Sequence, residues 1–212
     1  MEWKQIPLGP LKTNAYVLYN ENKEAVIFDP GGEGVKLNQW LKSEGLTPKA
    51  ILLTHAHFDH IGAVDEVRDR WEIPVYIHKK EKAWLMDPKK NGSTLFMGIN
   101  SVKIKDADYL IKEAGNLEIG PFSFEVFETP GHSPGSVSFY FSKLEIVFSG
   151  DALFAGGIGR TDLPGGSYEV LIDSINSKLM ELPEKTVVAS GHGPLTTIRI
   201  EKDSNPFLTG AL

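Results

Sequence analysis

Four side chains of the types that bind metal ions fall within six consecutive residues, namely His55, His57, Asp59 and His60. Neutral imidazole and carboxylate oxygen are the ligands that zinc and related divalent transition metals prefer. In an extended backbone His55 and His57 point to the same side, because side-chain direction repeats every two residues. Asp59 and His60 follow on a tightening turn, so they can face a second position beside the first. The spacing therefore favours two adjacent metal ions over one.

A short buried strand and a helix start flank this ligand run. Residues 49–53 form an apolar run of strand length, and residues 62–67 begin with a helical pattern. Side chains on such a strand-to-helix turn can converge on one point. Three later segments also combine a strand-like apolar run with a turn rich in glycine, and these turns carry His132, Asp151 and His192. The glycines let the backbone approach an ion closely or take positive φ angles.

Each of these side chains also has an ordinary structural role that must be weighed. A lone histidine at a strand end is usually solvated or caps a helix. A lone aspartate after glycine is usually a turn or helix-cap residue, and this alternative applies to Asp151. Five of the six histidines nevertheless lie in the motifs, and only His78 does not. The grouping favours metal binding for the five, whereas His78 is interpreted as structural.

Two further charged residues are candidates for supporting roles. Asp29 ends a predicted buried strand, where its carboxylate could hold the free N–H of a ligand imidazole. An Asx-turn before Pro-Gly is an equal alternative for Asp29. Arg160 either pairs with Asp162 as a brace of its loop or faces an anionic group of the substrate.

The motifs and their order resemble the metallo-β-lactamase superfamily, through HxHxDH at 55–60 and the later GHS, GD and GHG segments. The resemblance spans roughly residues 3–200, and the segment 158–166 is similar to that of small glyoxalase II-like hydrolases. It implies an α/β fold, a four-layer αββα sandwich, with a binuclear site at its edge. The implied ligands are His55, His57 and His132 for one ion, Asp59, His60 and His192 for the other, and Asp151 as a bridge.

The implied cofactor is a pair of divalent metal ions, with zinc foremost and iron or manganese as alternatives. Two such ions lower the pKa of a shared water, which leaves a bridging hydroxide as the nucleophile, and Asp59 would orient it as the catalytic residue. A small-molecule thioester is the easiest substrate to rationalise. A thiolate leaves with a thiol pKa of about 8.5, whereas a departing amine must be protonated and no general acid is evident.

One feature departs from full-length glyoxalase II. Those enzymes carry a helical C-terminal region that supplies basic residues to glutathione, whereas this sequence ends at Leu212, shortly after GHG. The segment after Asp151 also lacks the family's basic and aromatic glutathione-binding loop. We therefore expect a thiol other than glutathione, or a different acyl group, as an alternative.

Other functions remain open. Persulfide dioxygenases resemble this chain in HxHxDH and in the GRTD segment but use one iron, held by two histidines and an aspartate. A metal-binding or electron-transfer module without hydrolysis is a third interpretation. Nuclease and β-lactamase functions rank lower, since no basic appendage and no export signal are evident.

Composition sets the broad class of the protein. With 212 residues and 41% hydrophobic content, the chain can form one sizeable core, so a single domain over 1–212 is predicted. The net charge of −6 argues against nucleic acid as a partner. The absence of an apolar run of about 18–20 residues and of a secretory signal predicts no membrane partner and a cytoplasmic location. The oligomeric state is left open.

Hydrophobic periodicity predicts the elements that position the motifs. Two blocks rich in strands, with helices between them, are typical of a helix–sheet–sheet–helix arrangement. Helices are predicted over 35–41 and 168–182, where apolar residues recur at helical spacing. Residues 87–108 are predicted to form a loop over or beside the site. The predicted strands are 3–8, 14–19, 25–29, 50–54, 75–78, 122–128, 136–141, 146–149 and 186–190.

Overall fold

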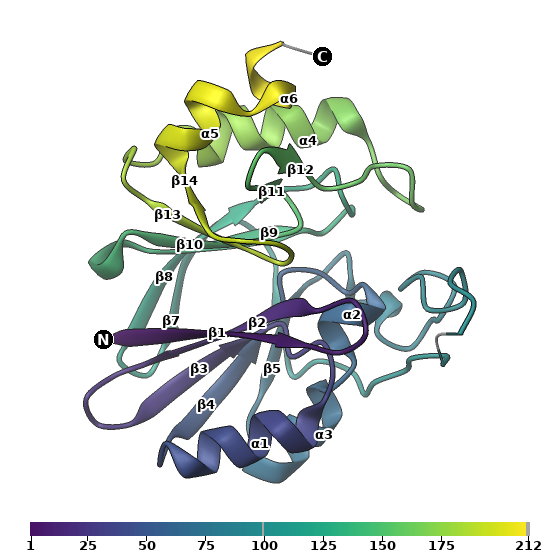
Figure 1. Ribbon diagram of the computed structural model, residues 1–212. Helices are drawn as coiled ribbons and strands as arrows, with labels where there is room; N and C mark the ends of the chain where they lie inside the picture. The colour runs from purple at the N-terminus through teal and green to yellow at the C-terminus, as the bar shows by residue number, and fades with distance from the viewer. Residues whose placement is uncertain (99, 211–212) are drawn as a thin grey trace. The chain divides into compact units, whose positions relative to one another are not determined.

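The structure is a computed structural model that describes residues 1–98 and 100–210, and it contains two compact units. The first is Met1–Lys112 and the second is Glu113–Leu212. Each unit has, among its described residues, one six-stranded sheet, and helices accompany both sheets (Figure 1). The α/β class is therefore confirmed, whereas the single domain over 1–212 stays a prediction.

The first unit has a mixed sheet of order β1-β2-β3-β4-β5-β6. The strands β1 to β3 pair antiparallel, and β3 to β6 pair parallel. The parallel pairs require crossovers, which α1 supplies between β3 and β4, and α3 between β4 and β5. The bounds are β1 Glu2–Leu8, β2 Thr13–Tyr19, β3 Glu24–Phe28, α1 Gly34–Ser43, β4 Thr47–Leu52, α2 Phe58–Ile61, α3 Val64–Trp71, β5 Val75–His78, a 3₁₀ turn Lys82–Trp84 and β6 Tyr109–Ile111.

This topology decides which residues of the first unit can meet. The carboxyl ends of β3, β4 and β5 lie at one edge of the sheet because the three strands are parallel. The amino end of β2 lies at the same edge, since β2 runs antiparallel to β3. The ligand run follows β4, so it lies at this edge. The helices α1 and α3 pack together on one face of the sheet through Leu37, Leu41, Val64 and Val67, all buried.

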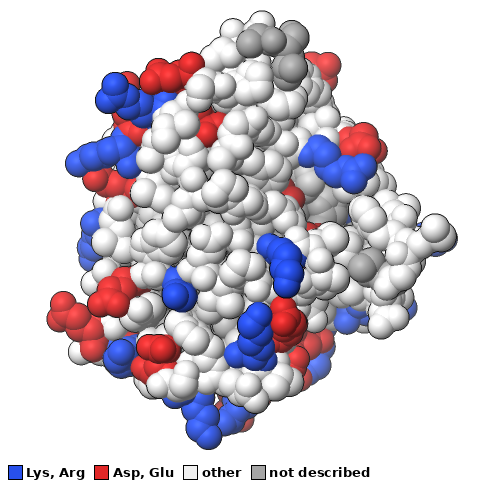
Figure 2. Space-filling view, in the orientation of Figure 1, with Lys and Arg blue, Asp and Glu red and all other residues white. Residues whose placement is uncertain are grey.

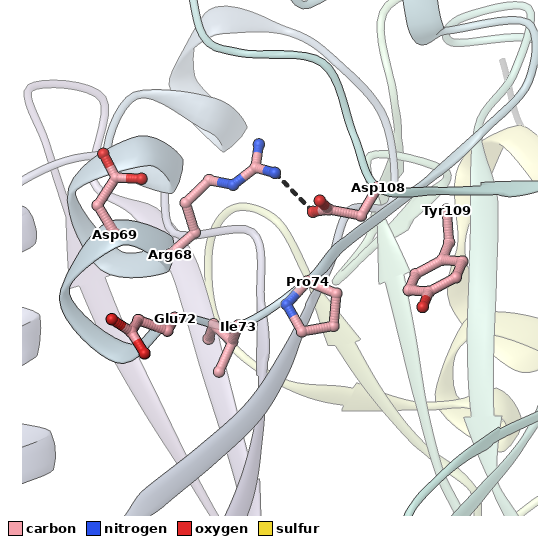
Figure 3. A pocket seen from close by; sticks show the side chains of 7 residues that line it. All are labelled: Arg68, Asp69, Glu72, Ile73, Pro74, Asp108 and Tyr109. Atoms are coloured by element: carbon pink, nitrogen blue, oxygen red, sulfur yellow. Dashed lines mark hydrogen bonds and ion pairs between the residues drawn. The ribbon is translucent and has the colours of Figure 1, made fainter.

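The opposite edge of the first sheet carries a charged brace (Figure 3). Arg68 of α3 donates hydrogen bonds to the Asp108 carboxylate and, over 2.8 Å, to the Asp106 carbonyl. Asp108 also accepts the N–H of Val75 at 2.8 Å. Val75 begins β5, so the brace lies at the edge away from the ligand run. Arg68 and Asp108 therefore hold the end of the long loop against the sheet and do not belong to the candidate site.

The second unit has a sheet of order β14-β13-β10-β9-β8-β7 and a short β11-β12 hairpin. The strands β8 and β10 both run antiparallel to β9, and β13 runs parallel to β10. The carboxyl ends of β8, β10 and β13 therefore share one edge. The bounds are β7 Gly115–Ile119, β8 Phe122–Glu128, β9 Val137–Phe141, β10 Ile146–Gly150, β11 Leu153–Phe154, β12 Gly157–Ile158, α4 Tyr168–Ser174, β13 Val187–Ser190, β14 Thr196–Thr197, α5 Ile198–Ser204 and α6 Pro206–Thr209.

The apolar residues that recur at helical spacing in 168–182 are buried, as a helix packed on the core requires. Leu171, Ile175 and Leu179 are fully buried and pack in a cluster with strand residues of the second sheet. The helix is shorter than predicted, because α4 continues as a π-helical turn over Ile175–Leu179 and then ends. Pro183 follows closely, and a proline disfavours helical backbone at the preceding residue.

The nine predicted strands are present with shifts of a few residues at their ends. The helix start predicted within 62–67 is confirmed, because α3 begins at Val64, and a separate helical turn, α2, precedes it. Residues 87–98 and 100–108 contain no helix or strand, which confirms the loop in the described part of that segment. β6 and β7 were missed, because they are short edge strands with little apolar alternation.

Surface and helix properties bear on the predicted partners. Lysine and arginine side chains are mixed with aspartate and glutamate on the face drawn in Figure 2. None of the described helices combines the length and the apolar character that crossing a bilayer requires. The predictions on nucleic acid, membrane and cytoplasmic location stay predictions.

Candidate metal centre

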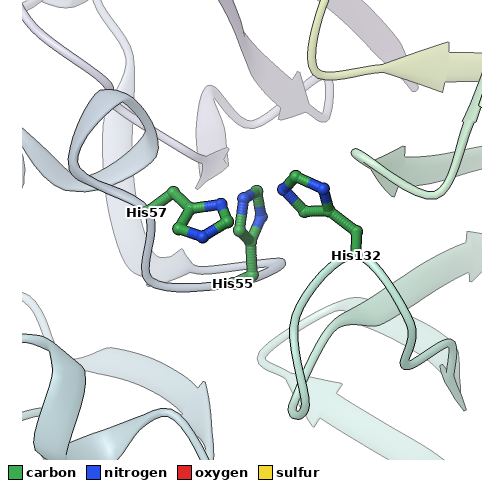
Figure 4. A group of neighbouring side chains, drawn as sticks. All are labelled: His55, His57 and His132. Atoms are coloured by element: carbon green, nitrogen blue, oxygen red, sulfur yellow. The ribbon is translucent and has the colours of Figure 1, made fainter. Parts of the chain in front are cut away.

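The first unit brings the ligand run together at the carboxyl edge of its sheet. His55 and His57 lie on the loop between β4 and α2, as Figure 4 shows for these two side chains, and His60 lies in α2. The ring centroids of His55 and His57 are 4.7 Å apart, and those of His55 and His60 are 4.1 Å apart. Three imidazoles are thus grouped within one unit, as the spacing predicts.

Asp29 lies beside this group, directly after β3. Its Oδ1 accepts the N–H of Thr54 at 2.8 Å, and its Oδ2 accepts the Thr54 hydroxyl at 2.5 Å. The same Oδ2 lies 2.9 Å from Nδ1 of His60, which must donate because a carboxylate only accepts. This contact leaves Nε2 of His60 as the nitrogen for an ion. Asp29 offers its oxygens to protein donors, so we interpret it as a support for His60.

Removal of the Asp29 carboxylate should destabilise the protein. We expect Asp29→Ala to lower the free energy of unfolding by roughly 3 kcal/mol, since two buried N–H donors lose their acceptor at about 1–3 kcal/mol each. Asp29→Asn is the matched control: it keeps an acceptor for Thr54 and tolerates the positive φ of 45° at this position, so its loss should be smaller. Urea unfolding of the metal-free protein measures both. An unchanged midpoint for Asp29→Ala would contradict the supporting role.

Two polar residues that the sequence analysis did not single out also hold the ligand run. Glu81 is fully buried, and its Oε2 accepts the N–H of Ala56, between the first two histidines, at 3.1 Å. The Thr13 hydroxyl donates to Oδ2 of Asp59 at 2.9 Å. Glu81 lies in the charged run 79–82, which resembles a solvated surface. The one sequence feature that could have identified Glu81 is its position three residues after β5, because the carboxyl end of β5 lies at the same edge of the sheet.

The second unit brings its three predicted ligands together at the carboxyl edge of its own sheet. His132 follows β8 (Figure 4), Asp151 follows β10 and His192 follows β13. Oδ2 of Asp151 is 3.6 Å from Nε2 of His132 and 3.6 Å from Nε2 of His192. A single carboxylate oxygen therefore lies equally far from two imidazole nitrogens.

These separations test whether the side chains fit metal ions. A distance of 3.6 Å is too long for a hydrogen bond. Two ligand atoms that share a tetrahedral zinc ion lie about 3.4 Å apart, given bonds of about 2.0–2.1 Å. Nε2 of His60 and Oδ2 of Asp59 in the first unit are also 3.6 Å apart. The His–Asp pairs of both units therefore have the spacing of atoms that coordinate a common ion.

The GRTD segment positions the His132 ring. Nδ1 of His132 lies 2.7 Å from the carbonyl of Arg160, which can only accept, so the ring presents Nε2 to the Asp151 side. The backbone passes so close here that a Cβ at Gly159 would lie 1.8 Å from the Asp151 carbonyl oxygen and 3.1 Å from Nδ1 of His132. Only glycine fits this position, which explains why the segment accompanies the histidine motifs.

The Arg160 side chain forms the predicted pair with Asp162. Its Nε and one terminal nitrogen each donate to a carboxylate oxygen at 2.7 Å. The guanidinium lowers the pKa of Asp162 to about 2. The pair thus stays ionised above about pH 4 and is lost only as the pH falls toward that low pKa. About half of the Arg160 side chain is exposed at 51%, and its contact with a substrate anion stays a prediction.

Each unit therefore assembles its own share of the predicted ligands. His55, His57, Asp59 and His60 meet in the first, with Asp29 beside them, and His132, Asp151 and His192 meet in the second. The assignment of ligands to two particular ions stays a prediction.

Comparison with known proteins places the chain among metallo-hydrolases. A model of the family described as the metallo-beta-lactamase superfamily matches residues 8–192. The probable metallo-hydrolase YqgX of Bacillus subtilis is 59% identical over 99% of both chains. The hydroxyacylglutathione hydrolase GloC of Haemophilus influenzae is 37% identical over 96% of both.

Two solved structures share the fold. The structure of the B3 metallo-beta-lactamase BLEG-1 is 63% identical, with a TM-score of 0.97 over 99% of this chain and 100% of that one. The structure of TTHA1623 in a di-iron-bound form is 39% identical, with a TM-score of 0.84 over 97% of this chain and 100% of that one. The predicted fold type is confirmed by this agreement.

Proposed function

The chain belongs to the metallo-β-lactamase superfamily, and from that premise we propose that it is a binuclear metal-dependent hydrolase that cleaves thioesters. The observation that carries the proposal is the 3.6 Å spacing of Asp151 from both His132 and His192, which two ions would explain if Asp151 shared one with each histidine. The likeness to GloC, which is named as a hydroxyacylglutathione hydrolase, supports the choice of substrate.

Seven side chains would hold two divalent ions. When bound, such ions lower the pKa of a shared water toward neutrality and polarise the substrate carbonyl. The proposed ligands are His55, His57 and His132 for one ion, Asp59, His60 and His192 for the other, and Asp151 between them. Zinc is the proposed metal, with iron and manganese as alternatives.

The protein's own groups would orient the reactants. Asp59 is fixed by the Thr13 hydroxyl on one oxygen, so it can accept a hydrogen bond from the attacking water in one defined direction. Asp29 and the Arg160 carbonyl fix the rings of His60 and His132. Because a thiolate is a good leaving group, no further side chain has to protonate it. Hydrolysis of a thioester in this site therefore needs no general acid, whereas hydrolysis of an amide would.

Three measurements on one purified preparation of the protein test the proposal. We expect about two metal ions per chain, mostly zinc, hydrolysis of lactoyl thioesters, and no oxygen uptake with glutathione persulfide. Elemental analysis, release of free thiol and an oxygen electrode give the three readouts. One iron per chain with persulfide-dependent oxygen uptake would instead establish a dioxygenase. Full metal loading without turnover would establish a binding module.

A second candidate function is β-lactam hydrolysis. It is favoured by the 63% identity to a structure described as a B3 metallo-beta-lactamase. A β-lactam nitrogen must be protonated as it leaves, and no acid for that step is evident among the described residues beside the proposed ligands. A chromogenic cephalosporin assayed beside the thioesters decides between the two, and we expect kcat/KM to be higher for the thioester.

A further inference from the structure

We propose that a cavity of about 260 Å³ in the first unit binds the acyl group of the substrate, and that this group is a neutral, apolar chain. This inference rests on the proposed thioesterase function and makes its substrate class specific. The residues that define the cavity are Leu8, Pro10, Leu11, Phe58, Asp59 and Val102.

Three segments form the walls of the cavity. The turn between β1 and β2 supplies Leu11, the start of α2 supplies Phe58, and the loop 87–108 supplies Val102. This loop is anchored by Asn91, a buried residue whose side chain donates to the carbonyl of Val102 at 2.9 Å and whose own carbonyl accepts the N–H of Phe58 at 3.0 Å. These two hydrogen bonds connect the loop to the helix that carries Asp59, so two walls of the cavity are held together within the first unit.

Close backbone packing lies behind Asp59. A Cβ at Gly31 would lie 1.7 Å from the Asp59 carbonyl oxygen, and one at Gly62 would lie 2.4 Å from the Gly31 carbonyl oxygen. No side chain can occupy these positions, and both glycines line the cavity. The backbone of Asp59 is therefore closely packed against Gly31, and Asp59 itself lines the cavity.

The chemistry of the lining selects an uncharged occupant. Asp59 is the only charged residue among the described residues that line the cavity, and the others are apolar residues, glycines and Asn100. No cation of this lining could pair with a carboxylate or phosphate on the acyl group, and Asp59 would repel one. An apolar chain would instead gain from burial against Leu11, Phe58 and Val102.

The volume indicates the length of the chain. A volume of 260 Å³ corresponds to about eight or nine water molecules at about 30 Å³ each. A lactoyl group leaves most of that space empty, whereas an acyl chain of about six carbons occupies most of it. Asp59 both lines the cavity and belongs to the proposed metal site, so the proposal places the carbonyl carbon of a bound chain beside the reacting centre.

A series of N-acetylcysteamine thioesters from acetyl to decanoyl tests the inference with the metal-loaded enzyme. We expect kcat/KM to rise about threefold to fourfold per methylene up to about hexanoyl and then to level off. Leu11→Asp should lower kcat/KM for hexanoyl about tenfold and for acetyl much less, because only a chain long enough to contact Leu11 loses apolar burial in the variant. Ile200→Asp, at a 52% exposed position on α5, is the matched control and should change neither.

A binding measurement separates this inference from the proposed function. Hexanamide, a neutral compound that carries the same acyl chain, should shift the amide resonances of Gly9, Gly32 and Gly62 when it is added to the metal-loaded protein, and Leu11→Asp should weaken these shifts. Absence of hydrolysis for every thioester would refute the proposed function, while these shifts would still support the cavity. Rates independent of chain length, equal losses for acetyl and hexanoyl in Leu11→Asp, or no shifts with hexanamide would overturn the inference.

Discussion

Asp151→Ala should release both metal ions and lower kcat at least about a thousandfold, because metal ions supply several kcal/mol of transition-state stabilisation. Oδ2 of Asp151 is the atom that lies 3.6 Å from Nε2 of both His132 and His192. Removal of this oxygen takes away the one anionic group that the two imidazoles share. Elemental analysis after gel filtration gives the metal content, and thiol release gives the rate.

A stability measurement distinguishes lost metal binding from a damaged fold. Without metal, the Asp151 carboxylate is a mostly buried charge, so Asp151→Ala should leave the metal-free protein about as stable as the wild type. Added zinc at about 100 times the Kd of each site should stabilise the wild type by about 2.7 kcal/mol per site and the variant hardly at all. Asp203→Ala, at an exposed position on α5, is the control and should behave as the wild type. Two retained ions and normal turnover would refute the bridging role.

Asp59→Ala is expected to lower kcat about as much as Asp151→Ala does but to release fewer metal ions. The Asp59 carboxylate is proposed to bind one ion only and to orient the attacking water, so about one ion per chain should remain while kcat falls about a thousandfold. Titration with zinc and a chromogenic chelator measures the number of sites. Two tight sites together with wild-type kcat would exclude Asp59 from both roles.

Thr13→Val provides a graded comparison for Asp59. It removes only the 2.9 Å hydrogen bond to Oδ2 of Asp59 and keeps the shape of the side chain. Loss of such an outer partner typically costs 10–100-fold in metal affinity or activity. We therefore expect Thr13→Val to fall between the wild type and Asp59→Ala in kcat. An effect as large as that of Asp59→Ala would mean that Thr13 does more than orient the carboxylate.

Elements whose signal is local were predicted well. The strands β5 and β8 have the predicted bounds, because each is an apolar run that turn residues interrupt on both sides. The end of α4 was predicted less well, and α2 was not predicted as a helix. A π-helical turn and a four-residue helix depend on what packs against them, which the periodicity of the segment does not contain.

The identity and order of the candidate ligands, and the family, follow from the sequence by itself. Spacing within HxHxDH depends only on local backbone geometry, and the later histidines are marked by the glycines beside them. Asp29 was predicted as a support for these ligands, but only the tertiary structure identified Glu81 and Thr13. Glu81 reaches Ala56 across 25 residues, and Thr13 reaches Asp59 across 46, because parallel and antiparallel pairing brings their strand ends to one sheet edge. Such contacts have no local pattern, since strand order sets them and short-range periodicity does not.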